Sequence, residues 1–201
     1  MLKVGLTGSI AVGKSYVCEV LRELGAFVLD ADQTARAVVA PHTVGWRKIV
    51  EHFGAEILQA NGELDRARLG NIVFADETKR KTLNSIVHPL VFAAQNEWLA
   101  ECEKRDRRAI ALIDAALMIE SGGYKRFDKL IVVWCAPEIQ LQRLIERNSL
   151  SEADAIKRIN AQMPQTEKKL YADFLIDSSN GFEETRKQTV EIFERLKLLV
   201  E

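Results

Sequence analysis

Short apolar runs alternate with amphipathic stretches along most of the chain. The first run, at residues 2–6, predicts a buried strand that leads into Gly5-Leu6-Thr7-Gly8. Apolar residues at helical spacing predict a helix over residues 14–24, and Gly25 is suited to end it. A second strand is expected at residues 27–29, with Asp30 and Asp32 just beyond its carboxyl end.

Residues 33–102 show a helical pattern with little strand character. One apolar stripe includes Trp46 and Phe53, and a second follows Asp65, which we expect to cap a helix. Pro89 is expected to open a further helix, because proline fits the first helical turn. We interpret this region as a helical insertion that covers the substrate.

Strands return in the second half of the chain. Strands are predicted at residues 109–113, 130–134 and 174–176, and helices from Pro137, after Ser151 and over residues 183–200. The segment Ser151-Glu152-Ala153-Asp154 resembles a capping box. Alternating strands and helices predict an α/β protein with a mostly parallel sheet.

The most informative motif is the stretch 8–15, Gly-Ser-Ile-Ala-Val-Gly-Lys-Ser, which matches G-x-x-x-x-G-K-[ST] completely. Glycines let the backbone turn its N–H groups toward phosphate oxygens, and the following helix adds its dipole. Lys14 can bridge the β- and γ-phosphates of ATP, and the Ser15 hydroxyl can bind Mg²⁺. A chance match in a glycine turn is the alternative, but such a match is rarer between a predicted strand and helix. The fingerprint G-x-G-x-x-G is missing, which disfavours a nicotinamide or flavin enzyme.

Composition narrows the class of protein. The 201 residues carry 28 Lys+Arg against 29 Asp+Glu, which argues against a broadly basic nucleic-acid binder. We expect no signal peptide and no membrane partner, because no apolar run approaches the ~18 residues of a membrane span. Three widely spaced cysteines fit a reducing cytoplasm, with Cys18 expected to be a buried, inert thiol. The oligomeric state stays open between a monomer and a weak homo-oligomer.

A phosphate loop alone is compatible with kinases, GTPases and motor ATPases. The chain has no Asn-Lys-x-Asp segment for reading guanine and is shorter than a usual motor ATPase, so a small-molecule kinase is favoured. Such a kinase needs a base for the acceptor hydroxyl, and Asp30 and Asp32 follow the second strand where ligands bind in open α/β sheets. The alternative is that one or both cap the next helix.

Further charged residues have two interpretations each. Asp114 either supports Mg²⁺ in the manner of a Walker-B carboxylate or is a solvated aspartate at a strand end. Arg143, Arg147 and Arg158 either close over ATP phosphates or form a solvated face with nearby glutamates. His88 contacts a substrate phosphate or orients a helix.

Several ordered segments resemble dephospho-CoA kinases nearly end to end. They are the phosphate loop with Gly5-Leu6-Thr7-Gly8, the stretch 24–32, Phe53-Gly54, Gly62-Glu63-Leu64-Asp65-Arg66, Val73-Phe74, His88-Pro89, Gln140-Leu141-Gln142-Arg143-Leu144 with Arg147, Arg158-Ile159 with Gln162, and Ala172-Asp173. The resemblance implies a P-loop NTPase-type three-layer fold with a mostly parallel five-stranded sheet. It implies a nucleotide-binding core (1–32, 105–136 and 172–201), a helical CoA-substrate domain (33–104) and a lid (137–171).

The resemblance also implies an activity and a set of site residues. The reaction is transfer of the ATP γ-phosphate to the 3′-hydroxyl of dephospho-CoA, with Asp32 as general base and Lys14 and Arg143 acting on the phosphates. The implied ATP-binding positions are Gly8, Ala11, Val12, Gly13, Lys14, Ser15 and Tyr16, and Ser15 also binds Mg²⁺. The implied substrate-binding positions are Thr7, Asp32, Arg66 and His88.

The sequence departs from the family pattern at a few positions. Ala11 replaces a glycine, Tyr16 a threonine, Asn148 an aspartate and Ser178 an asparagine, and the stretch 114–120 lacks the usual Pro-Leu-Leu. None of these changes removes a charged group that the transfer needs. Two other functions remain open from the sequence: a kinase acting on a nucleoside or another small alcohol, and a nucleotide-sensing module without transfer.

Overall fold

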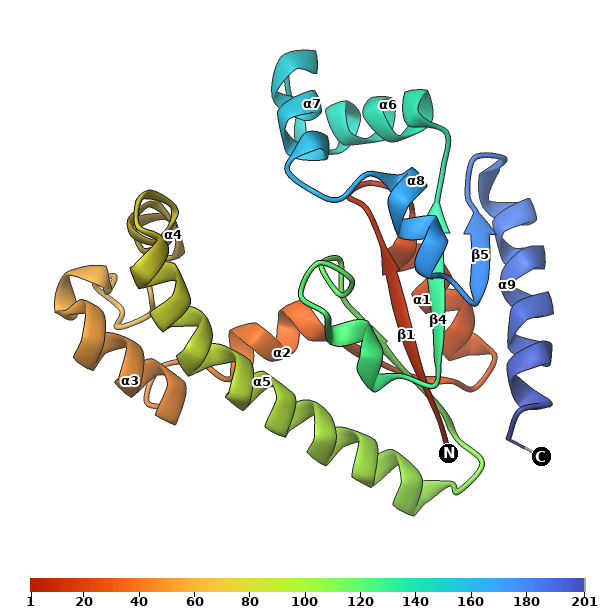
Figure 1. The fold of residues 1–201 in the computed structure, drawn as a ribbon, viewed down its shortest axis with the longest axis horizontal. Helices are drawn as coiled ribbons and strands as arrows, with labels where there is room; N and C mark the ends of the chain where they lie inside the picture. Colours follow the sequence, from red (N-terminus) through yellow and green to blue (C-terminus); the bar gives the residue numbers. More distant parts are fainter. Residues whose placement is uncertain (201) are drawn as a thin grey trace. The chain divides into compact units, whose positions relative to one another are not determined.

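The computed structural model describes residues 1–200, and its framework is a five-stranded sheet in the order β2-β3-β1-β4-β5 (Figure 1). The strands are β1 (Leu2–Gly8), β2 (Phe27–Asp30), β3 (Ile110–Asp114), β4 (Lys129–Trp134) and β5 (Phe174–Asp177). β1 pairs in parallel with β3 and β4, and β4 pairs in parallel with β5. The predicted α/β class, its five strands and their parallel pairing are confirmed.

Helices connect these strands in the alternation that the sequence predicts. The α-helices are α1 (Lys14–Glu23), α2 (Ala31–Ala37), α3 (Val44–Phe53), α4 (Arg66–Ala75), α5 (Glu77–Arg105), α6 (Pro137–Asn148), α7 (Glu152–Asn160), α8 (Gln165–Lys168) and α9 (Gly181–Lys197). Short 3₁₀ turns lie at Ala55–Ile57, Gly123–Arg126 and Lys169–Tyr171. No helix among residues 1–200 is long and apolar enough to cross a lipid bilayer.

Two helices cover one face of the sheet. Val4 and Leu6 on β1 are completely buried against apolar residues of α1 and α9, which lie side by side (Figure 1). The opposite face of β1 is closed at Gly5, where an added Cβ would lie 2.6 Å from Met118 Sδ. Strands buried on both faces read as continuous apolar runs, and this is why residues 2–6 predict a strand so clearly.

The described chain divides into two compact units. The first contains residues 1–29 and, among the described residues, 101–200, and it includes the sheet core; the second contains residues 30–100. The second unit holds α2, α3, α4 and most of α5, and it has an apolar core of its own that includes Ile49, Phe53 and Leu69. Its helical character agrees with the pattern of residues 33–102.

Most helix ends lie where the local signals place them. The Asp65 carboxylate accepts the Arg68 N–H at the start of α4, and the Ser151 hydroxyl accepts the Asp154 N–H at the start of α7. Gly25, with φ 99°, follows the end of α1. These caps depend on side chains within three residues of the helix end, so sequence reasoning can find them.

The prediction for Pro89 is wrong. Pro89 lies inside the 29-residue helix α5 and does not open a helix. An internal proline removes one backbone hydrogen bond, yet Leu83, Ile86 and Val87 just before it pack against the core of the second unit. Tertiary packing on that side holds the helix through the proline.

Candidate active site

The phosphate loop joins β1 to α1 by a tight backbone path. Gly8 passes so close to β4 that an added Cβ would lie 2.4 Å from the Val133 carbonyl oxygen. Ala11 (φ 61°) and Gly13 (φ 82°) both adopt the left-handed conformation. The alanine that replaces a family glycine therefore keeps the conformation for which glycine is suited, at some cost in backbone strain.

The N-terminus of α1 lacks a side-chain cap. Its first-turn N–H groups follow Gly13, which has no side chain to accept them, whereas α2, α3, α4 and α7 are each capped by a side-chain oxygen. The Ser9 hydroxyl in the same loop is buried without a hydrogen-bond partner. A helix N-terminus without a side-chain cap, together with the helix dipole, favours a bound anion such as a phosphate.

Lys14 opens α1, and its side chain reaches Asp114 at the C-terminal end of β3. Its ammonium forms an ion pair with Asp114, whose carboxylate is largely buried and also accepts a hydrogen bond from the Cys18 thiol at 3.4 Å. Asp114 is thus an interior carboxylate, not the solvated strand-end residue that the sequence left open. Burial and then the Asp114 charge raise the pKa of Cys18 far above its usual range, so the thiol stays protonated and inert, as predicted.

The segment after β3 is held by a lysine that the sequence analysis does not single out. The Lys168 ammonium is completely buried, donates to the Ala116 carbonyl at 2.7 Å and pairs with Glu120 at 2.9 Å. The Thr7 hydroxyl donates to the same carbonyl at 3.3 Å. Lys168 lies in a polar run of the sequence, and no local signal distinguishes it from a solvated lysine.

Arg143 lies beside the phosphate loop. Its guanidinium donates to the hydroxyl and the carbonyl of Ser178 at 3.0 and 2.8 Å, and the Ser178 hydroxyl donates to the Val12 carbonyl at 2.7 Å. Nη1 of Arg143 would lie 3.6 Å from a Cβ placed on Gly13. The serine that replaces a family asparagine therefore connects the arginine to the loop.

The other arginines have less specific surroundings. Arg147 donates to the neighbouring Asn148 side chain at 3.0 Å, and Arg158 is exposed on α7. Tyr16 packs edge-on against the Phe182 ring, with 4.7 Å between the ring centroids. Its aromatic ring thereby contacts the first turn of α9.

The remaining predicted residues belong to the second unit. Asp30 caps α2, because its carboxylate accepts the N–H groups of Asp32 and Gln33 at 2.8 and 3.0 Å. Asp32 itself is exposed in the first turn of α2. Arg66 is exposed at the start of α4, and His88 is exposed on α5 with its ring 6.1 Å from that of Phe92. The capping alternative therefore applies to Asp30 and leaves Asp32 available as a base.

The residues at the loop fit a magnesium ion that a nucleotide brings with it. Ser15 offers an exposed hydroxyl in the first turn of α1, and Asp114 provides a carboxylate beside Lys14. Oxygen donors suit Mg²⁺, which commonly takes its other ligands from phosphates and water. Residues 1–200 contain no cluster of three or more His, Cys, Asp or Glu that could hold a metal by themselves.

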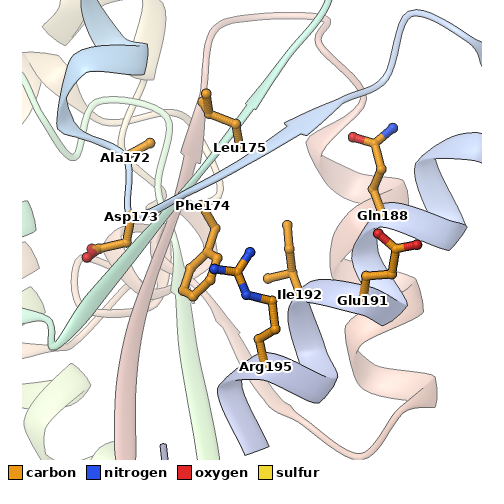
Figure 2. A pocket seen from close by; sticks show the side chains of 8 residues that line it. All are labelled: Ala172, Asp173, Phe174, Leu175, Gln188, Glu191, Ile192 and Arg195. Carbon is orange, nitrogen blue, oxygen red and sulfur yellow. The ribbon is translucent and has the colours of Figure 1, made fainter. Parts of the chain in front are cut away.

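A groove of about 290 Å³ lies elsewhere, between the edge strand β5 and α9 (Figure 2). The Arg195 guanidinium lies over the Phe174 ring, 4.7 Å from its centroid. Asp173 pairs with Lys129, and Gln188 bonds both the N–H and the C=O of Asp177. These polar groups connect the edge strand β5 to β4 and to α9, so the groove does not extend the phosphate site.

The fold and the loop define the chain as a P-loop protein of the kinase type. A family model described as dephospho-CoA kinase matches residues 2–184. The chain is 48% identical over 196 residues to the dephospho-CoA kinase of Geobacillus kaustophilus, with 96% of each chain covered. The chain therefore belongs to the dephospho-CoA kinase family.

Solved structures agree with this assignment. The dephospho-CoA kinase from Campylobacter jejuni matches with a TM-score of 0.73 and 29% identity, covering 97% of this chain and 96% of that one. The protein TT1252 from Thermus thermophilus matches with a TM-score of 0.84 and 28% identity, covering 96% of both chains. The resemblance inferred from sequence segments is confirmed.

Proposed function

We propose that this chain phosphorylates dephospho-CoA, using ATP with Mg²⁺, and releases CoA and ADP. The observation that carries the proposal is a complete phosphate loop, with Lys14 paired to a buried aspartate, in a chain of the dephospho-CoA kinase family. The family match favours dephospho-CoA as the acceptor over a nucleoside or another small alcohol.

The proposed reaction is a direct transfer. The 3′-hydroxyl oxygen of the acceptor forms a bond to the γ-phosphorus as the bond to the β,γ-bridging oxygen breaks, and ADP leaves. Asp32 orients the hydroxyl and takes its proton. Lys14 and Arg143 stabilise the charge on the transferred group, and a bound Mg²⁺ supplies further neutralisation.

Each part of the chain has a proposed role in this reaction. ATP is held by the core segments 1–32, 105–136 and 172–201. Dephospho-CoA is bound by the segment 33–104, through residues such as Arg66 and His88. The segment 137–171 acts as a lid that excludes water from the reaction. The cysteines are free and buried, which supports a cytoplasmic location for the protein.

A direct assay tests the reaction. The purified chain is incubated with ATP, Mg²⁺ and dephospho-CoA, and CoA is identified by mass spectrometry. Parallel reactions contain a nucleoside panel or small alcohols as acceptors. Phosphorylation of one of these with dephospho-CoA ignored would refute the proposal, as would ATP binding by calorimetry with no ADP formed from any acceptor.

The base is tested by replacing Asp32 with asparagine. Asp32→Asn is expected to fold and to bind ATP but to lose about 10²-fold or more in kcat. Asp30→Asn is the matched control, because asparagine caps helices as well as aspartate does and each variant removes one negative charge from this part of the chain. Asp32 is not the base if both variants turn over at similar rates.

A further inference from the structure

One residue of the phosphate loop, Ile10, is held on both its backbone polar groups by side chains from a distant part of the sequence. The Ile10 N–H donates to Gln162 Oε1 at 2.8 Å, and the Ile10 carbonyl accepts from Gln140 Nε2 at 2.8 Å. Gln140 lies in the first turn of α6, and Gln162 lies between α7 and α8. The two glutamines thus come from opposite ends of the segment that contains α7.

A third glutamine joins this arrangement. Gln165 donates from Nε2 to Gln140 Oε1 at 2.7 Å and accepts the Cys135 N–H, just after β4, at 3.0 Å. Gln140 is only 2% exposed, and each of its two amide atoms has a partner. The orientations of these side-chain amides are therefore set by fixed backbone donors and acceptors.

Neutral amides suit this place chemically. A carboxylate in place of one of these glutamines would repel the phosphates of a nucleotide. A lysine or arginine there would compete with Lys14 and Arg143 for the phosphates. A glutamine supplies both a donor and an acceptor without a charge, so it can hold the loop backbone and leave the electrostatics to Lys14 and Arg143.

We propose that Gln140, Gln162 and Gln165 are positioning residues that couple the segment 137–171 to the phosphate loop. They fix the N–H and the carbonyl of Ile10, so the following N–H groups are arranged for phosphate, and they connect both ends of the segment to the same residue. A nucleotide that binds the loop therefore also favours one position of the segment. This inference rests on the proposed function in taking the segment as a lid.

The test uses Gln140→Met and Gln162→Met, which keep side-chain length and remove the hydrogen bonds. Gln142→Met is the matched control, because Gln142 is exposed on α6 and bonds only Glu146, outside the arrangement. ATP affinity is measured by calorimetry without an acceptor, and hydrogen exchange of α7 is measured with and without ATP. Circular dichroism and thermal unfolding establish that each variant is folded.

Gln140→Met and Gln162→Met should each raise the Kd for ATP about 5- to 10-fold, which corresponds to the loss of one hydrogen bond to the binding loop. They should also lose the slowing of exchange in α7 that ATP causes in the wild type, while Gln142→Met matches the wild type in both measurements. If Gln140→Met does not fold, the half-buried Gln162 still provides the test.

Two results would overturn the inference: ATP affinity within twofold of the wild type in the folded variants, or an unchanged response of α7 to ATP. A wild-type chain that binds ATP but leaves dephospho-CoA unmodified would disprove the proposed function alone. The coupling between the loop and α7 would still be measured, because neither readout uses the acceptor.

Discussion

Replacing Lys168 with methionine is expected to destabilise the first unit and to loosen the segment after β3. The ammonium of Lys168 is completely buried and has two partners, the Ala116 carbonyl at 2.7 Å and the Glu120 carboxylate at 2.9 Å. Methionine keeps most of the aliphatic stem, so the variant loses mainly these polar contacts.

The magnitude follows from what the partners can do without the ammonium. Removing one member of a buried ion pair typically costs about 3–5 kcal/mol. Glu120 is 24% exposed and still accepts the Met163 N–H, and Ala116 keeps the Thr7 hydroxyl, so both partners retain some compensation. We therefore expect a loss of about 2 kcal/mol in the free energy of unfolding, which lowers Tm by about 4–8 °C.

The reciprocal change should cost more. Glu120→Gln leaves the charge of Lys168, which has no exposure to water, without its anion, and about 3 kcal/mol is expected. The double variant should lose at least about 1 kcal/mol less than the sum of the single losses, because the two residues share one interaction.

Urea unfolding and thermal unfolding measure these free energies. Lys157→Met is the control, because the Lys157 side chain is 81% exposed and its pairing with Asp154 is a surface contact. The reasoning is refuted if Lys168→Met is as stable as the control variant, or if the losses in the double variant simply add.

Two further predictions concern the loop and the thiol behind it. Ala11→Val should lose about 1–2 kcal/mol of stability, because a β-branched residue resists the φ of 61° at this position. Ala11→Gly should change stability little, because glycine relieves the strain but makes the unfolded chain more flexible. Thermal unfolding compares the two, and equal Tm values would contradict strain at Ala11. The raised pKa of Cys18 means that above pH ~8.5 the unfolded chain loses this proton before the folded chain does. Stability should then fall with rising pH, by up to about 1.4 kcal/mol per unit from this thiol. Denaturation of the wild type and Cys18→Ala in alkaline buffers measures the difference, and identical slopes would contradict it.

Local signals predicted the features that depend on near neighbours. Asp65 and Ser151 cap helices through N–H groups three residues away, and the phosphate loop lies between a strand and a helix as its motif requires. The apolar runs predicted the strands because strands buried on both faces need such runs. The prediction that Pro89 starts a helix was wrong, because the packing of Leu83, Ile86 and Val87 extends α5 on the N-terminal side of the proline.

The amino-acid sequence by itself determined the order of strands and helices, the position of the phosphate loop and the family. The tertiary structure alone decided that Lys168 is buried, that Asp30 caps a helix while Asp32 stays exposed, and that glutamines hold the backbone N–H and carbonyl of Ile10. Ile10 and Gln162 are 152 residues apart in the chain, and no pattern within a few residues encodes their contact. Such contacts exist only once the parallel sheet brings the ends of β1 and β4 together, because each parallel connection spans a long intervening segment.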